Sequence, residues 1–294
     1  MKFEWIEKHA VEFDIQAMCA VLGVSRAGYY AWQHRPPSRR EEANAALDES
    51  IVAVFAESRE TYGSPRVFNA LKKQHVPCSE NRVARRMREK ELVSVRRRKF
   101  RPQTTDSKHD LPIAENLLEQ KFAATGTNQR WVGDITYIPT GEGWLYLAVV
   151  IDLFSRRVVG WAMSSRLKAE LACRAIDMAV LRRGKPLDLV YHSDRGIQYA
   201  STEFRATLTR FGITPSMSRK GNCYDNAVAE SFFDTLKVEL VHRFKFRDRA
   251  VARVLLIDFM EEYYNQNRSH STLGFLSPND YETLMANPQK NCVH

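Results

Sequence analysis

The chain has 294 residues, of which 44% are hydrophobic, so it is long enough for two or three domains and apolar enough to build a core. Its 44 Lys and Arg residues outnumber its 35 Asp and Glu residues, and the resulting formal charge of +9 favours a polyanion as partner. No signal peptide, no apolar run near the ~18 residues of a membrane span and no Cys-x-x-Cys pair is found, so we expect a cytoplasmic protein with reduced thiols, no membrane contact and no common zinc site.

Residues 1–40 are predicted to form a helix-turn-helix-like segment. Asp14 is placed to cap a helix whose apolar residues recur at intervals of three and four, and Gly23 is placed to end it. Ser25 is placed to cap the next helix. The two prolines of "RPPSRR" cannot continue that helix, so this stretch is expected to be a linker.

Residues 41–95 are predicted to form a second helix-turn-helix-like, DNA-binding domain. An apolar stripe runs through "LDESIVAVF", Ser64 before a proline is expected to cap a second helix, and Ser79 a third. The third helix turns its apolar side chains inward and spreads its basic ones over the other faces. A helix of this kind enters the major groove of DNA, and we expect DNA contacts from three of its arginines: Arg82, Arg85 and Arg86.

Residues 96–125 are predicted to be a basic linker, because they begin with the charged run of "VRRRKFRPQTT". Such a run is either a solvated tether or a segment that follows a DNA strand. Arg97 is our candidate DNA contact in this run. At the other end of the chain, residues 286–294 are predicted to be a tail.

Residues 126–285 have the pattern of an α/β domain. Three strands are predicted first, in "QRWVGDITYIP", in the nearly all-apolar "WLYLAVVIDLFS" and in "RRVVGWAMS", with a hairpin between the second and the third. Two further short strands then alternate with helices, and two long helices follow. This order predicts a mixed five-stranded sheet with helices on its faces.

Three carboxylates in this core suggest a site. Asp134 interrupts an apolar strand, Asp194 ends the fourth strand in "VYHSD", and Glu230 lies in the amphipathic helix "NAVAESFFDTLKVEL". Each alone has an ordinary explanation as a turn cap or a solvated side chain. If the first and fourth strands are neighbours, however, the helix can bring all three into one cleft. A divalent cation would then relieve their repulsion, and oxygen ligands without nearby His or Cys suit Mg²⁺ or Mn²⁺.

The helix of the third carboxylate carries further polar residues. Asn226 and Lys237 share an edge with the glutamate, which suggests a DNA contact and a phosphate contact beside a metal ligand, with a solvated lysine as the alternative. His192 should point to the same sheet face as the aspartate two residues later, either as a packed histidine or as a site neighbour. Asn222, just before the helix, is a second candidate neighbour.

The chain resembles the catalytic, OrfB-type subunit of insertion-sequence-three family transposases, of the DDE retroviral-integrase superfamily. Four stretches carry the resemblance: "WVGDITYIPTGEGWLYLAVVIDLFSRRVVGWAM", "HSDRGIQYAS", "SMSRKGNCYDNAVAESFFDTLKVEL" and "YYNQNRSHSTLGFLSPNDYE". "YGSPRV" and the helix after it are similar to the family's helix-turn-helix region. The resemblance implies an RNase H-like integrase catalytic core in which Asp134, Asp194 and Glu230 bind two Mg²⁺ ions, with Lys237 as the basic residue beyond them.

The function that this resemblance implies is DNA transposition. Such an enzyme nicks the ends of an insertion sequence and joins each freed 3′-OH to a second phosphodiester, by way of a circular intermediate. Its partners would be the terminal inverted repeats and target DNA, held by a homodimer or higher oligomer on paired ends, and an upstream reading frame as partner or fusion. One alternative is an RNase H-like nuclease or resolvase, which needs neither two helical units nor "YNQNRSHSTLGFLSP". The other is a non-enzymatic DNA-binding regulator, against which the intact acidic triad argues.

Overall fold

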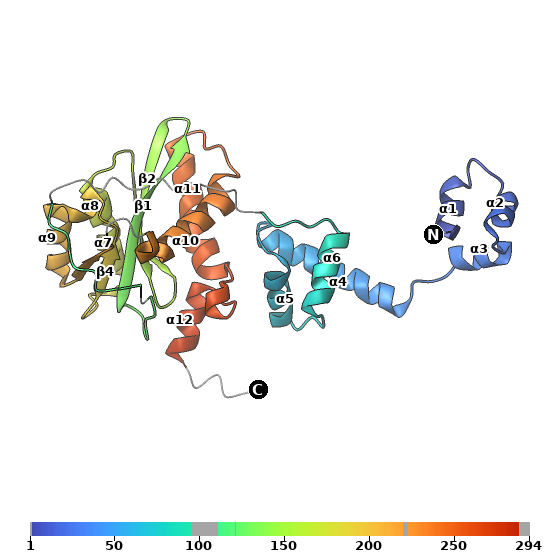
Figure 1. The fold of residues 1–294 in the computed structure, drawn as a ribbon, viewed down its shortest axis with the longest axis horizontal. Coiled ribbons are helices and arrows are strands. Elements are labelled where there is room, and N and C mark those ends of the chain that lie inside the picture. Colours follow the sequence, from blue (N-terminus) through green and yellow to red (C-terminus); the bar gives the residue numbers. More distant parts are fainter. Residues whose placement is uncertain (1, 96–110, 121, 220–222, 288–294) are drawn as a thin grey trace.

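The computed structural model describes residues 2–95, 111–120, 122–219 and 223–287. Two small helical units precede an α/β core, and Figure 1 shows the three in a row. Arg97 and Asn222, most of the expected linker and most of the expected tail lie outside the described residues.

The first helical unit consists of α1 (Lys2–His9), α2 (Ile15–Leu22) and α3 (Arg26–Gln33). Its predicted ends are confirmed, because Asp14 accepts a hydrogen bond from the start of α2, Ser25 caps α3, and Gly23 ends α2 in the left-handed region at φ 62°. The first helix was not predicted from the sequence. Its single buried residue, Ile6, packs into a small core with residues of the other two helices.

The second helical unit consists of α4 (Arg39–Glu57), α5 (Ser64–Lys73) and α6 (Glu80–Glu89). Ser38 and Glu41 form a capping box at the start of α4, so this helix begins inside the stretch expected to be a linker. The expected cap at Ser64 is wrong: Gly63 occupies the cap position, and Ser64 is already the first helical residue. Ser79 caps α6 as predicted. The expected apolar stripe packs as a separate core that includes Leu47, Ile51, Val67, Leu71, Val83 and Met87.

The core contains a mixed five-stranded sheet with the strand order β3-β2-β1-β4-β5. Its strands are β1 (Arg130–Thr140), β2 (Gly143–Asp152), β3 (Val158–Ser164), β4 (Val190–Ser193) and β5 (Thr214–Met217). The first three are antiparallel neighbours, whereas β4 pairs in parallel with both β1 and β5. Val132 lies opposite His192, so the neighbourhood of the first and fourth strands is confirmed.

Helices cover both faces of the sheet. One face packs against α7 (Ala169–Arg183), α8 (Ile197–Ala200) and α9 (Thr202–Phe211). The other packs against α10 (Ala227–Leu236) and α11 (Arg249–Asp258), which continue as wider π-helical turns over Lys237–Val241 and Phe259–Asn267. Short 3₁₀ turns lie at Cys223–Asn226 and Ser271–Leu273, and α12 (Pro278–Ala286) follows. Within the described residues, no helix is both long and apolar enough to cross a membrane.

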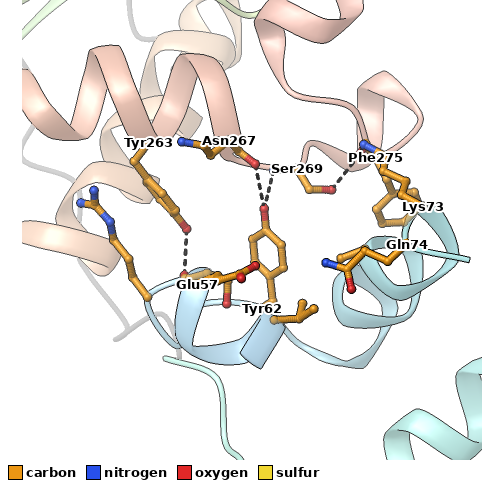
Figure 2. A pocket seen from close by; sticks show the side chains of 12 residues that line it. Glu57, Tyr62, Lys73, Gln74, Tyr263, Asn267, Ser269 and Phe275 are labelled. Atoms are coloured by element: carbon orange, nitrogen blue, oxygen red, sulfur yellow. Dashed lines mark hydrogen bonds between the residues drawn. The ribbon is translucent and has the colours of Figure 1, made fainter. Parts of the chain in front are cut away.

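The second helical unit docks on the segment that follows α11, as Figure 2 shows. The Tyr263 hydroxyl donates to the Ser58 carbonyl over 3.1 Å. The Tyr62 hydroxyl accepts from the Ser269 amide over 2.6 Å and donates to the Asn267 carbonyl over 3.2 Å. A cavity of about 500 Å³ lies between the two parts. The second helical unit therefore packs against Tyr263 and against the C-terminal "YNQNRSHSTLGFLSP" segment that follows it.

A buried ion pair lies beside these docking contacts. The Arg268 guanidinium donates three hydrogen bonds of 2.7–3.1 Å to the Glu239 carboxylate. Their side chains are 6% and 8% exposed. Two charges this deep are stable because each is fully matched by the other in bidentate geometry. We call Arg268 and Glu239 the buried ion pair.

Candidate active site

Asp134 lies within β1, on the face of the sheet that α10 covers. Strand alternation places it on the same side as Val132, which packs in the core beneath α10. The residue between them has to be glycine. A Cβ on Gly133 would lie 1.7 Å from the hydroxyl oxygen of Tyr191, which β4 places directly against the β1 backbone. The close approach of β1 and β4 at this point brings the two strand-borne aspartates to one place.

Asp194 follows the last residue of β4 and is held by the turn that it begins. Its Oδ1 accepts a hydrogen bond of 2.9 Å from the Gly196 amide. Arg195 is turned away, because its Nε donates to the Ser218 carbonyl over 2.6 Å. The Arg-Gly turn after the strand thus fixes Asp194 at the end of β4 through its Oδ1 atom. The Gly196 hydrogen bond does not involve the Oδ2 atom.

Asp134, Asp194 and Glu230 interact electrostatically, and we call them the carboxylate cluster. Burial, followed by the Asp194 carboxylate, raises the pKa of Asp134 well above its usual range, and Glu230 adds to this effect. Burial also raises the pKa of Glu230, with Asp194 and the neighbouring Asp234 as further causes. In the described part of the chain, no three acidic, His or Cys side chains are already arranged to hold a metal ion. The cluster is therefore a set of nearby carboxylates and not a finished coordination shell.

Lys237 lies at the edge of this cluster. It is the first residue of the π-helical turn after α10, and its Nζ is 5.7 Å from the centroid of the Tyr137 ring. Burial lowers the pKa of Lys237, while Asp234 and Asp134 oppose that shift. A partly desolvated ammonium beside carboxylates is placed to meet another anion that enters the site.

His192 is a packed histidine, one of its two expected alternatives. It is fully buried, with Nδ1 2.8 Å from the Ser216 hydroxyl and Nε2 3.1 Å from the Ser218 hydroxyl. Burial lowers its pKa to about 4, so the ring is neutral at pH 7. Asn226 is also inside the molecule: it is 5% exposed, and its Oδ1 has no hydrogen-bond partner among the described residues.

A further acid, Asp225, five residues before Glu230, was missed from the sequence. It is fully buried and accepts hydrogen bonds of 2.8–3.1 Å from the backbone and guanidinium of Arg219. Asn116 and Gln120 also donate to it, over 3.0 and 3.1 Å. The Arg219 hydrogen bond lowers the pKa of Asp225 to about 2. This acid ties the segment after β5 and the segment before the core to the start of the Glu230 helix, and partners up to 109 residues away left no local signal in the sequence.

The three arginines proposed for α6 have different surroundings. Arg82 donates to the Asn44 side chain over 2.8 and 3.1 Å. Arg86 forms ion pairs with Asp48 on α4 and with Glu89. The side chain of Arg85, by contrast, is 49% exposed.

Three family models match the chain. Two integrase core domain models match residues 124–223 and 211–278, and an HTH-like domain model matches residues 41–100. Among curated relatives, the transposase InsF for insertion sequence IS3A of Escherichia coli (strain K12) is 48% identical over 96% of this chain and 98% of its own. The insertion element IS600 uncharacterized 31 kDa protein of Shigella sonnei is 44% identical over 89% of this chain and 96% of its own.

Two solved structures of viral integrases are more distantly similar. One is the simian T-cell lymphotropic virus intasome in complex with PP2A regulatory subunit B56 gamma, at 20% identity, a TM-score of 0.47 and 73% coverage of both chains. The other is the HTLV-2 integrase catalytic core domain in complex with magnesium, at 20% identity and a TM-score of 0.41, covering 54% of this chain and 99% of that one.

Proposed function

The chain belongs to the IS3 family of insertion-sequence transposases, and from this premise we propose that Asp134, Asp194 and Glu230 are its catalytic carboxylates. The observation that carries the proposal is their mutual repulsion: the pKa of Asp134 is raised by burial and by both other acids. The Lys237 ammonium offsets part of this repulsion, but keeping three acids together remains costly in the folded state. Such a cost is typical of sites that bind a cation or do chemistry.

The cation that suits this cluster is Mg²⁺ or Mn²⁺, two ions per active site. All three side chains offer hard carboxylate oxygens, and His192 is turned to two serine hydroxyls instead of joining them. Bound ions of this kind stabilise the attacking and leaving oxygens of an in-line displacement at phosphorus. Asp134, Asp194 and Glu230 would hold the ions.

The reaction consists of two displacements at phosphorus. In the first, water attacks the phosphodiester at the end of the element, the P–O3′ bond breaks, and a free 3′-OH leaves. In the second, this 3′-OH attacks another phosphodiester, a new P–O bond forms, and a 3′-OH of that strand leaves. Lys237 would hold the phosphate beside the scissile bond, a role supported by its partly buried ammonium next to the cluster.

The remaining parts of the chain serve DNA binding. The second helical unit and the basic run that contains Arg97 would contact the terminal inverted repeats, and Asn226 would lie beside the DNA end. Of the three α6 arginines, Arg85 is included in this proposal, whereas Arg82 and Arg86 are left out because they bond to Asn44 and Asp48 of α4. We propose that a homodimer or higher oligomer pairs two ends, alone or with an upstream-frame partner or fusion.

A strand-transfer assay tests this proposal. Labelled terminal-repeat duplexes are incubated with the full chain and Mg²⁺, and nicked and joined products are separated on a denaturing gel. We expect both products from wild type and neither from Glu230→Gln. Glu203→Gln, at an exposed glutamate on α9, is the matched control and should keep both. Nicking without joining would favour the nuclease alternative, and binding without either product would favour the regulator.

A further inference from the structure

One side of α6 packs into the core of the second helical unit, and another side is exposed. Val83 and Met87 are buried in the unit's own core. A different stripe is exposed, with side chains at i, i+4 and i+7: Asn81, Arg85 and Arg88. This spacing aligns the three on one face of the helix. We call them the exposed stripe of α6.

Arg82 and Arg86, on the flank of α6, are committed to α4. The side chain of Arg86 is 17% exposed and that of its partner Asp48 is 9% exposed. The Asp48 carboxylate accepts from Arg86 Nε over 2.7 Å, and the paired charge lowers the pKa of Asp48. Withdrawing this arginine to reach DNA would leave a buried carboxylate without its main partner, so these two arginines hold the helix pair together.

Arg85 is free to exchange its partner. Its Nε lies 3.8 Å from the Glu89 carboxylate, and the two side chains are 49% and 47% exposed. An exposed pair at this distance is weak and screened, so a base edge or a phosphate can replace the glutamate. Helix α6 also makes none of the docking contacts named above: the unit docks through residues such as Tyr62 and Lys73, and in Figure 1 α5 stands between α6 and the core.

We propose that the exposed stripe of α6 is the face that enters the major groove of the element ends, an inference that rests on the proposed function. The N-terminal turns of such a helix meet the base edges, so Asn81 in the first turn of α6 and Arg85, one turn later, read sequence. Asn pairs in bidentate fashion with adenine, and Arg with guanine. Arg88, near the end of the helix, contacts phosphate.

Equilibrium binding of the full chain to two duplexes tests this assignment. Fluorescence anisotropy is measured with a terminal-repeat duplex and a scrambled duplex at several KCl concentrations. Asn81→Ala and Arg85→Ala should each weaken terminal-repeat binding by roughly 5- to 150-fold, with little effect on the scrambled duplex. Arg88→Ala should weaken both alike and reduce the salt slope by about 1.

Two further variants separate the possible outcomes. Arg174→Ala, an exposed arginine on α7, is the charge-matched control and should bind both duplexes as wild type does. Arg86→Ala should lower the melting temperature of the second unit, a change that the stripe variants should not cause. Stripe variants that keep wild-type preference would overturn the proposal, as would an Arg82→Ala chain that melts normally but loses preference. A wild-type chain with no preference for the terminal repeat would instead defeat end recognition itself.

Discussion

Two places in the core bury charge, and they do so in opposite ways. In the buried ion pair, the Arg268 guanidinium meets Glu239 through three hydrogen bonds. In the carboxylate cluster, the acids repel one another, and the pKa of Asp134 rises well above its usual range because of burial and of both other acids. The first arrangement is complete as it stands, whereas we propose that the second becomes favourable when a cation enters. Charges that hold a fold are matched within the chain, and charges that serve a reaction are left for a ligand to match.

The largest expected effect is the loss of catalysis when one acid of the carboxylate cluster is neutralised. Asp134→Asn, Asp194→Asn and Glu230→Gln should each lower nicking and joining by at least about 10³-fold, because each removes a ligand charge worth several kcal/mol in the transition state. Terminal-repeat binding should stay near wild type, and none of the three variants should unfold more readily than wild type. Single-turnover assays beside melting curves provide the measurement. A variant that joins ends at near-normal rate in Mg²⁺ would remove its residue from the cluster.

The opposite result is expected when the buried ion pair is broken. Glu239→Gln or Arg268→Met should lower the free energy of unfolding by about 3–5 kcal/mol, because the remaining charge stays buried without its partner. Urea titration of the full chain measures this. The exposed pair of Arg210 and Asp177 is the control, since Arg210→Ala should cost about 0–1 kcal/mol. Equal losses at both pairs would contradict the view that burial makes the first pair structural.

A smaller effect is expected at Lys237, a partly buried cation beside the carboxylate cluster. Lys237→Ala should slow nicking and joining by roughly 10²-fold, because the phosphate beside the scissile bond is less firmly placed. Lys237→Arg should retain part of the rate, and Lys237→Glu should be worst because it adds a fourth carboxylate. Single-turnover rates against Mg²⁺ concentration test this role. Rescue of Lys237→Ala by raised Mg²⁺ alone would show that the lysine acts through the metal and not on DNA.

The smallest expected effect concerns stability against pH. A folded-state pKa raised above the ordinary value means that wild type loses stability as pH rises from about 4 through the raised pKa of Asp134. Asp134→Asn lacks this loss, so it should be more stable than wild type at pH 7, and the difference should shrink toward pH 4. His192, whose pKa is lowered to about 4, titrates in both chains and cancels. Urea titrations in chelator from pH 4 to 8 measure the difference, and superimposable curves would contradict the assignment.

Local features of the fold could be predicted from the sequence, because neighbouring residues determine them. Asp14, Ser25 and Ser79 cap their helices as expected, since a cap needs only its own side chain and the next turn. Ser64 shows the limit of this reasoning. Gly63 takes the cap position, and Ser64 is already the first residue of the helix. This helix therefore begins without a hydrogen bond from a side-chain cap.

Contacts between distant segments could not be predicted in the same way. His192 packs against a serine 24 residues away, and Asp225 accepts from an asparagine 109 residues away. Arg86 is matched by an aspartate 38 residues earlier, which no helical periodicity reveals. The carboxylate cluster was easier to predict from the sequence. Its acids lie within a strand, at a strand end and on a helix, and bringing them together requires just one assumption, that β1 and β4 are neighbours.

We propose that the carboxylate cluster is left unmatched for a cation, and thermal unfolding in a Mg²⁺ titration tests this claim. Wild type, Asp134→Asn and Arg210→Ala are compared at constant ionic strength, with KCl replacing MgCl₂. A ligand that binds the folded state raises the melting temperature by mass action. We predict that Mg²⁺ raises the melting temperature of wild type and Arg210→Ala, and that Asp134→Asn starts higher and responds little. Equal Mg²⁺ responses in all three chains, or none in any, would contradict the claim.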